Sequence, residues 1–162
     1  MKKAIFLDRD GTLNDNSRNY YIWQKENFRL NPGVVEALKE LRSKGYLLIV
    51  ITNQGGISRG ACSAKDVEAL HDHLRSMLEQ EGVLLDEIYC CPHHHSVEAC
   101  LCRKPQPLMI EKAVARFNID PASSWMIGDA QRDVEAGKAA GLRTILIESN
   151  SDLRKVLGIV VS

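Results

Sequence analysis

Residues 3–12 read KAIFLDRDGT, a short apolar run that leads directly into two acidic residues. The apolar part, residues 3–7, predicts a β-strand that is buried on both faces, as strands of parallel sheets are. Asp8 and Asp10 come immediately after it. In an open parallel sheet, ligands bind beyond the carboxyl ends of the strands. This stretch therefore predicts both a strand of a parallel sheet and a chemically active edge.

The rest of the chain continues as strands that alternate with helices. Apolar runs of strand length and amphipathic segments with the helical period follow one another. Further strands are expected at residues 46–51, 87–90, 125–127 and 143–147, and helices at 34–44, 63–78, 107–117, 132–140 and 152–157. This order predicts an α/β fold, a Rossmann-like parallel sheet with helices on both faces. No repeat or linker interrupts it, so a single domain over residues 1–162 is expected.

The composition is that of a globular protein with balanced charge. Hydrophobic residues make up 44% of the 162 residues, and 21 Lys and Arg balance 21 Asp and Glu. Nucleic acid and anionic membranes attract basic proteins, so neither is an expected partner. The apolar run before Asp8 is too short for a secretory signal or a membrane span, which favours a cytoplasmic protein.

Unusual polar residues follow four of the predicted strands. Asp8 follows the first strand, Thr52 the second and Asp129 the fourth, while a loop ending in Arg103 and Lys104 follows the third. The carboxyl ends of parallel strands share one edge of the sheet. We therefore expect these residues to converge on one site.

Asp8 and Asp10 have the arrangement expected of a nucleophile and its acid–base partner. Asp8 is predicted to attack a phosphoryl group and form an aspartyl-phosphate. Asp10 would protonate the leaving oxygen and later deprotonate the attacking water. An Asp-x-Asp pair by itself is also typical of a turn. The apolar strand before it and the Gly-Thr after it favour the catalytic interpretation.

The complete set of motifs resembles the haloacid dehalogenase superfamily of phosphatases. Its four signatures appear in order: DRDGT at residues 8–12, Thr52 at a strand end, Lys104, and Gly-Asp at residues 128–129 with Asp133. The resemblance implies that the Thr52 hydroxyl and the Lys104 ammonium stabilise charge on the transferred phosphoryl group. The motifs extend over most of the chain, so chance agreement is a poor explanation.

The same resemblance implies that catalysis depends on Mg²⁺. Asp8 and Asp129 would bind the ion through their carboxylates, and Asp10 through its backbone carbonyl. Such hard oxygen ligands suit Mg²⁺. Asp133 would hold a metal-bound water in the outer shell. The ion would lie between the nucleophile and the phosphate that repels it.

A cluster of cysteine and histidine residues precedes Lys104. Three thiolates and one imidazole can wrap a tetrahedral Zn²⁺, and two close pairs across one short loop supply them: Cys91, His93, Cys100 and Cys102. Cys90, His94 and His95 are competing ligands, so the choice among the histidines stays open. Four protein ligands leave no position for water, so the zinc is expected to be structural and to hold the loop of Arg103 and Lys104.

Three further residues of these types are expected to have ordinary roles. Cys62 has no partner nearby in the sequence, so it is expected to pack like any small apolar side chain. His71 and His73 lie on the predicted helix 63–78 and are expected at its surface.

Only loops are expected to cover the site. The intervals between Asp8, Thr52 and Lys104 are filled by the predicted elements, which leaves no room for a cap domain. Candidate substrate contacts from the surrounding loops are Tyr20, Asn53, Arg59 and Arg103. Arginine suits a phosphate because its planar fork pairs two oxygens at once.

The zinc loop, residues 91–105, contains CPHH at its start and CLCRKP at its end. These motifs resemble those of two groups of this superfamily, the heptose bisphosphate phosphatases and the histidinol-phosphate phosphatases. Residues 52–60, TNQGGISRG, are more similar to the heptose group, whereas the short loop between His93 and Cys100 is nearer to the histidinol-phosphate group. The preferred substrate is a small phosphorylated metabolite, a heptose 1,7-bisphosphate cleaved at its 7-phosphate. Histidinol phosphate is the alternative. A non-catalytic zinc-stabilised interaction module is a third hypothesis, which leaves the convergent carboxylates without a purpose.

Overall fold

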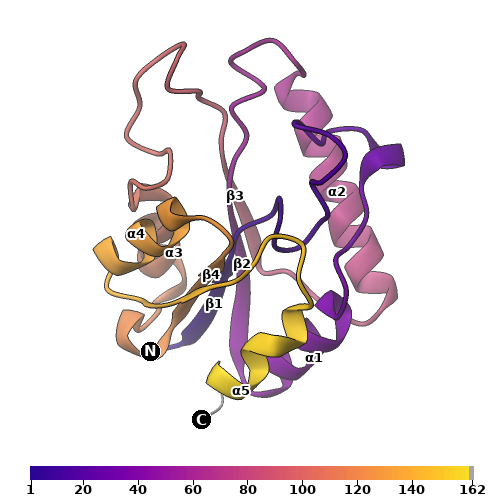
Figure 1. Cartoon of the computed structure of the whole chain (residues 1–162). Helices are drawn as coiled ribbons and strands as arrows, with labels where there is room; N and C mark the ends of the chain where they lie inside the picture. The colour runs from indigo at the N-terminus through magenta and orange to yellow at the C-terminus, as the bar shows by residue number, and fades with distance from the viewer. Residues whose placement is uncertain (161–162) are drawn as a thin grey trace.

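β1, Lys3–Leu7, occupies the centre of a five-stranded sheet, and each of its four apolar residues is buried. The computed structural model describes residues 1–160. The order of strands is β3-β2-β1-β4-β5, and every neighbouring pair is parallel (Figure 1). The other strands are β2 Tyr46–Asn53, β3 Glu87–Cys91, β4 Trp125–Gly128 and β5 Arg143–Leu146. The predicted α/β parallel sheet is confirmed.

The strand order changes direction beside β1. Phe6 lies opposite Ile49 of β2 on one side and opposite Met126 of β4 on the other. The chain runs outward from β1 to β3 and then crosses to β4, so the carboxyl ends of β1 and β4 flank the switch point. Open α/β sheets bind ligands at such a point. Asp8 and Asp129 follow these two strands directly.

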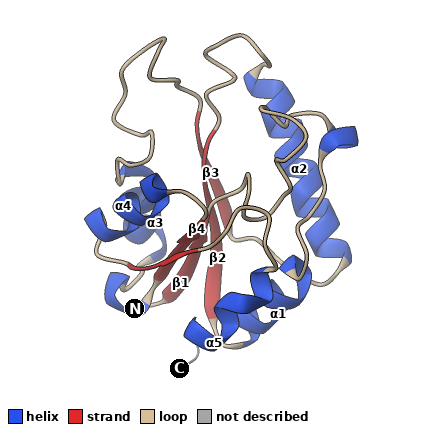
Figure 2. Ribbon diagram, in the orientation of Figure 1, coloured by secondary structure: helices blue, strands red, loops and turns tan. Residues whose placement is uncertain are grey.

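Helices cover both faces of the sheet (Figure 2). α1 Val34–Ser43, α2 Ala64–Gln80 and α5 Leu157–Val160 lie on one face, and α3 Leu108–Phe117 and α4 Gln131–Ala139 lie on the other. Leu38 of α1 and Leu74 of α2 pack into one hydrophobic core with β1 and β2. Met109 of α3 and Ala136 of α4 pack into the second. Three short 3-10 helices complete the chain: η1 Lys25–Asn27, η2 Pro121–Ser123 and η3 Leu153–Val156.

The start of α2 shows how local sequence fixes an element. The Ser63 hydroxyl accepts a hydrogen bond from the Asp66 backbone N–H at 3.1 Å, and the Asp66 carboxylate accepts one from the Ser63 N–H at 2.8 Å. This reciprocal capping box satisfies two backbone donors that the first turn leaves free. The predicted helix start at this position is confirmed.

Two predictions require correction. β2 continues two residues beyond the predicted end, because Thr52 and Asn53 pair with Cys90 and Cys91 of β3. The prediction that His71 lies on the surface is wrong, since the residue is only 5% exposed. It lies on the face of α2 that carries Leu74 into the core, so the helical period buries it.

No separate domain covers the active edge of the sheet in residues 1–160. Only η1, α1 and α2 lie between the strands β1, β2 and β3. No helix of this range has the length and apolarity needed to cross a membrane. The predicted single domain ends at Ser162, and its last two residues lie outside the described range.

Candidate active site

The loops that follow β1 to β4 meet beyond the carboxyl ends of the strands and enclose a polar cavity of about 300 Å³. The residues that line it come from four separate stretches of chain: Asp8, Asp10, Asn16, Tyr20, Tyr21, Asn53, Gln54, Gly55, His94, Arg103 and Arg132. The convergence expected from the sequence is therefore found at the predicted edge.

Asp8 lies at the end of β1, and its carboxylate is paired with a buried lysine. Lys104 Nζ donates to Asp8 Oδ1 at 2.8 Å, to Asp133 Oδ1 at 2.7 Å and to the backbone carbonyl of Ile51 at 2.7 Å. Burial raises the pKa of Asp8 well above its usual range, Lys104 opposes this, and the charge of Asp133 adds to it. Burial alone would lower the pKa of Lys104, but the two carboxylates outweigh it and raise that pKa. The lysine therefore stays charged, and a further cation beside Asp8 would favour its ionised form.

The acidic residues around Asp8 fit a magnesium ion. Asp8, Asp129 and Asp133 can bring one carboxylate oxygen each to within 4.8 Å of one another. Asp8 Oδ2 and Asp129 Oδ1 are buried without any hydrogen-bond donor. A buried carboxylate oxygen without a partner is costly, and a hard divalent cation would satisfy both. Asp133 Oδ1 accepts a hydrogen bond from Lys104 Nζ, which is consistent with an outer-shell position.

Glycine makes room for these carboxylates. A Cβ added to Gly11 would overlap the Asp129 carboxylate, and one added to Gly128 would overlap that of Asp133. Gly11 also has φ of +85°, a conformation that other residues adopt at a cost. The glycine of the DRDGT motif is thus required by the close approach of the β4 loop.

Asp10 is held by three neighbours rather than by the lysine. Its Oδ1 accepts hydrogen bonds from Arg9 Nη2 at 2.7 Å and Asn14 Nδ2 at 3.0 Å, and its Oδ2 accepts one from Gln54 Nε2 at 2.9 Å. Burial acts to raise the pKa of Asp10, but the Arg9 charge and these hydrogen bonds outweigh it and lower that pKa. The carboxyl lines the cavity beside Asp8.

The end of β2 anchors the lysine loop. The Asn53 side chain accepts a hydrogen bond from the Lys104 backbone N–H at 3.0 Å and donates one to the Lys104 carbonyl at 3.1 Å. Both polar ends of Asn53 therefore hold Lys104, although the residue also lines the cavity. Thr52 accepts a hydrogen bond from Gln54 Nε2 at 2.8 Å, which leaves its own hydroxyl proton free to donate.

The cysteine and histidine cluster has the form of a four-ligand metal site. One ligand atom from each of Cys91, His93, Cys100 and Cys102 lies within 4.8 Å of the others. His93 Nδ1 lies 3.3 Å from Cys102 Sγ, and Cys91 Sγ lies 2.9 Å from Cys102 Sγ. Three thiols and an imidazole this close suit a tetrahedral zinc ion. Burial acts to raise the pKa of Cys100, but hydrogen bonds from the Arg103 and Cys102 backbone lower it to about 7, which favours the thiolate.

The competing histidines face elsewhere. His94 Nδ1 lies 2.6 Å from the Ser96 hydroxyl, and its ring stacks on that of His95 with centroids 4.3 Å apart. His93 is thus the histidine that joins the cysteines among the described residues. Its Nε2 lies 4.0 Å from Glu98, a carboxylate able to orient the ring.

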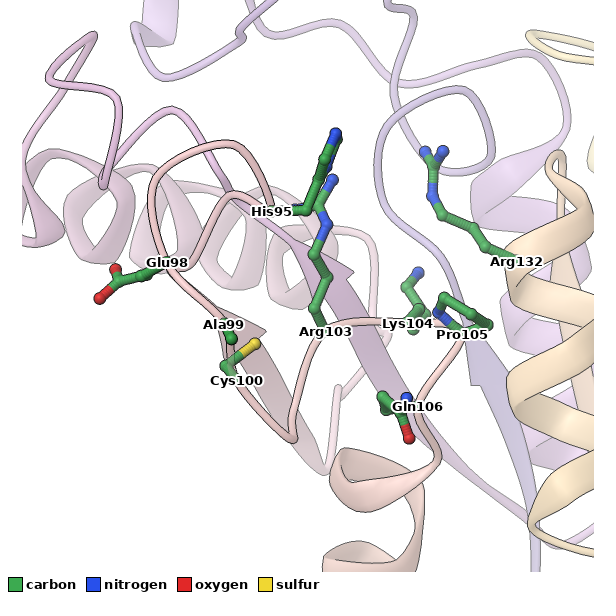
Figure 3. Close-up of a pocket in the computed structure, with 9 residues that line it drawn as sticks. All are labelled: His95, Glu98, Ala99, Cys100, Arg103, Lys104, Pro105, Gln106 and Arg132. Atoms are coloured by element: carbon green, nitrogen blue, oxygen red, sulfur yellow. The ribbon is translucent and has the colours of Figure 1, made fainter.

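A second cavity of about 480 Å³ adjoins the first and shares two arginines with it. Arg103 comes from the zinc loop and Arg132 from the first turn of α4, and Figure 3 shows them on opposite sides of Lys104 and Pro105. Arg103 Nη1 donates to the His93 carbonyl at 2.9 Å, so the zinc loop orients it. The two arginines therefore lie between the cavity at Asp8, called the inner cavity below, and this second cavity, called the outer cavity.

Of the other predicted substrate contacts, Tyr20 lines the inner cavity, whereas Arg59 lines neither cavity. Arg59 Nη1 donates to the Tyr21 hydroxyl at 3.3 Å, and Tyr21 does line the inner cavity. Arg59 can therefore reach a ligand only indirectly in this arrangement.

The chain is similar to known enzymes over most of its length. Residues 101–158 match the family model described as HAD-hydrolase-like. The D-glycero-beta-D-manno-heptose-1,7-bisphosphate 7-phosphatase of Pasteurella multocida is 43% identical over 159 residues, covering 94% of this chain and 85% of that enzyme. The enzyme of the same name from Escherichia coli K12 is 43% identical over 147 residues, covering 87% and 76%. This chain belongs to the heptose bisphosphate phosphatase family.

Solved structures agree with that membership. The D,D-heptose 1,7-bisphosphate phosphatase from B. bronchiseptica, complexed with magnesium and phosphate, superimposes with a TM-score of 0.85 at 32% identity, over 97% of this chain and 86% of that one. As a member of the heptose bisphosphate phosphatase family, the chain is a magnesium-dependent phosphatase of the haloacid dehalogenase type. The expectation of this enzyme class is confirmed.

Two residues that line the inner cavity, Gln54 and Arg132, were not predicted from the sequence. Gln54 bonds both Asp10 and Thr52, and Arg132 lines both cavities. Gln54 stands directly after Thr52-Asn53 in the sequence, so its place next to the motif was a usable signal. Arg132 could have been found as the residue before Asp133 at a helix N-terminus, where anions bind readily.

Proposed function

We propose that this chain hydrolyses the 7-phosphate of a heptose 1,7-bisphosphate, with Asp8 as nucleophile and Asp10 as general acid and base. The observation that carries the chemistry is the pairing of Asp8 Oδ1 with Lys104 while Asp8 Oδ2 has no donor. Lys104 orients the carboxylate, and the second oxygen is left for the magnesium ion that would offset the repulsion of the phosphate. The similarity to enzymes named heptose-1,7-bisphosphate 7-phosphatases supports the substrate.

In the first step, a carboxylate oxygen of Asp8 attacks the phosphorus atom. A bond forms between this oxygen and phosphorus, the bond from phosphorus to the sugar oxygen breaks, and Asp10 gives its proton to that oxygen. The negative phosphoryl group favours the protonated form of Asp10, since like charges raise the pKa of a carboxyl. Lys104 is paired with Asp8, and the Thr52 hydroxyl is bonded to Gln54, which also bonds Asp10; both groups would stabilise charge on the transferred group.

In the second step, Asp10 accepts a proton from a water molecule, and the water oxygen attacks phosphorus. The bond to Asp8 breaks, phosphate leaves, and both carboxyl groups return to their starting state. Bound Mg²⁺, held by Asp8, Asp129 and the Asp10 carbonyl, would supply positive charge that offsets repulsion between the carboxylate and the phosphate. Asp133 keeps Lys104 in place throughout.

The two arginines between the cavities supply a place for the second phosphate. A bisphosphate with one phosphate at Asp8 has its other phosphate some distance away, beyond the inner cavity. Arg103 and Arg132 line both cavities at that boundary, and Arg103 has further donors besides the one that bonds the His93 carbonyl. Arg103 is the substrate contact expected from the sequence and Arg132 is a second candidate, because the planar fork of arginine suits a phosphate. A small soluble sugar phosphate is consistent with a cytoplasmic enzyme, which we also propose.

The test compares kcat/KM for heptose 1,7-bisphosphate and histidinol phosphate, with magnesium present. We expect a clear preference for the heptose bisphosphate and release of the 7-phosphate alone, seen by phosphorus NMR. A preference for histidinol phosphate would overturn the substrate, while the phosphatase class would stand.

A further inference from the structure

Arg9 is the largest of the fully buried side chains among the described residues, and its contacts reach from the active site into α2. Its Nη2 donates to Asp10 Oδ1 at 2.7 Å and to the Ile22 carbonyl at 2.6 Å. Its Nη1 lies 3.0 Å from Nε2 of His71, which is 62 residues away in the sequence. A buried guanidinium needs partners for its donors, and His71 is the partner on the Nη1 side.

The chemistry of arginine fixes the state of His71. A guanidinium carries five N–H donors and no acceptor, so His71 Nε2 must accept the hydrogen bond. The imidazole is therefore neutral, with its proton on Nδ1. Burial, and next the positive charge of Arg9, lower the pKa of His71 to about 3, so the ring stays neutral in the working range of most enzymes. A protonated ring would face Arg9 with a second positive charge.

The hydrogen bond between Arg9 and His71 bears on the orientation in which the Arg9 guanidinium binds Asp10. Arg9 Nε and Nη2 both donate to Asp10 Oδ1, at 3.1 and 2.7 Å. Because the guanidinium is planar, fixing Nη1 by His71 sets the direction of the other two nitrogen atoms. Phe28 lies beside the group, with its ring centre 6.0 Å from Arg9 Cζ. Without an acceptor at position 71, the guanidinium would turn toward other partners and Asp10 would follow.

We propose that His71 is a positioning residue that holds the general acid Asp10 in place through Arg9. This rests on the proposed function, which makes Asp10 the group that protonates the leaving oxygen. His71 does not line the cavity at Asp8 and belongs to neither group of candidate metal ligands. Its effect is expected only where accurate placement of Asp10 limits the reaction.

Leaving groups of different basicity separate this role from a general loss of structure. The alkoxide of a sugar needs a proton as it departs, whereas 4-nitrophenolate departs without one. Displacement of Asp10 should therefore slow an alkyl phosphate much more than an aryl phosphate. The value of kcat/KM reports the step that breaks this bond, because the later hydrolysis of the aspartyl-phosphate does not enter it.

The experiment measures kcat/KM for glucose 6-phosphate, a primary alkyl phosphate, and for 4-nitrophenyl phosphate. Asp10→Asn serves as the reference for complete loss of the acid. For His71→Leu we expect a loss of about 10-fold or more on the alkyl phosphate and under about 3-fold on the aryl phosphate, as for a displaced acid–base group. His71→Gln should restore most of the loss, since its Oε1 can accept from Arg9 where Nε2 does.

A matched control is Val67→Ala, one helical turn before His71 on the same buried face of α2. It removes buried methyl groups from the packed face of α2 and leaves the contact between His71 and Arg9 in place, so any loss should be equal for both substrates. Equal losses in His71→Leu, or no rescue by His71→Gln in a folded protein, would overturn the inference while Asp10→Asn still separates the substrates. If Asp10→Asn itself fails to separate them, the acid role of Asp10 in the proposed function is wrong, and the inference falls with it.

Discussion

Asp8 and Asp10 have opposite surroundings although one residue separates them. Asp8 is buried beside Lys104 with one oxygen free, and burial raises its pKa. Asp10 accepts hydrogen bonds from Arg9, Asn14 and Gln54, which lower its pKa against the effect of burial. Two carboxyl groups in different environments can divide the roles of nucleophile and acid–base group. The neighbours, rather than the residue type, distinguish them.

Asp8→Asn is expected to abolish turnover of 4-nitrophenyl phosphate. The amide has nearly the same shape as the carboxylate but is a very poor nucleophile. Asp10→Asn should reduce turnover by about 10²–10⁴-fold, as expected for a general acid–base group. Phosphate release measures both, and circular dichroism checks the fold. Asp120→Asn, before β4 at the opposite end of the sheet, is the control and should keep full activity. A folded Asp8→Asn protein with near wild-type activity would refute the nucleophile assignment.

Arg132→Ala is expected to lower kcat/KM for heptose 1,7-bisphosphate by about 10-fold or more, the usual scale for losing a charged hydrogen bond. For a monophosphate without a second phosphate, the change should be small. Arg59→Ala is the matched comparison, because Arg59 lines neither cavity. Steady-state kinetics on both substrates decide between them. A large loss in Arg59→Ala with none in Arg132→Ala would support the contact expected from the sequence instead.

At the scale of elements, the zinc loop connects the third strand to the catalytic lysine. β3 ends at Cys91, the first ligand, and the loop returns through Cys100 and Cys102 to Lys104. Asn53 at the end of β2 holds the backbone of Lys104 from the other side. The segment has no helix or strand of its own between Cys91 and Leu108. A metal ion would supply the order that secondary structure does not.

The purified protein is expected to contain about one zinc ion per chain, as for a closed four-ligand site. The double variant Cys100→Ser/Cys102→Ser should lose the zinc, together with thermal stability and phosphatase activity, since Lys104 loses its anchor. Elemental analysis and thermal unfolding measure these effects. Cys62→Ser is the control, because Cys62 lies outside the cluster. Undiminished zinc in the double variant would rule the site out.

At the scale of the whole molecule, the two hydrophobic cores support the edge of the sheet where the strands end and the active site lies. The core under α1 and α2 and the core under α3 and α4 lie on the two faces of the sheet and pack its strands together. β1 and β4 bring Asp8 and Asp129 to the switch point, and α2 brings His71 to Arg9. Catalytic geometry and global stability are therefore linked through buried polar contacts.

The buried neutral His71 should make stability depend on pH. Its pKa is about 3 in the folded chain, against an ordinary value of 6.5. Below about pH 6.5 the unfolded chain binds a proton that the folded chain does not, so stability is complete above this pH and falls toward pH 3. Relative to His71→Gln, the wild type should lose up to about 1.4 kcal/mol for each pH unit within this window.

The difference is measured by urea unfolding of the wild type and of His71→Gln at about pH 7 and at about pH 4.5. The first pH lies above the window and the second lies inside it. Titration of the cysteine cluster affects both proteins alike and cancels. Parallel pH dependence in the two proteins would show that His71 is not held neutral in the folded state.

Much of this protein follows from short stretches of its sequence. The strands and helices were predictable because each has its own apolar period, and the start of α2 because its capping residues are three positions apart. The DRDGT motif and the cysteine cluster also carry their chemistry locally, as strand-end carboxylates and closely spaced ligands. The order of elements then determined which residues would share one edge of the sheet.

Only the tertiary structure decided which side chains meet across long intervals of chain. His71 and Arg9 are 62 residues apart, and Asn53 and Lys104 are 51 apart. The helical period gives the face of α2 on which His71 lies, but not the buried arginine that the face covers. Arg132 likewise lines the same cavities as Arg103 only because α4 begins where the zinc loop ends. Such contacts depend on how elements pack in three dimensions, and no local pattern encodes that packing.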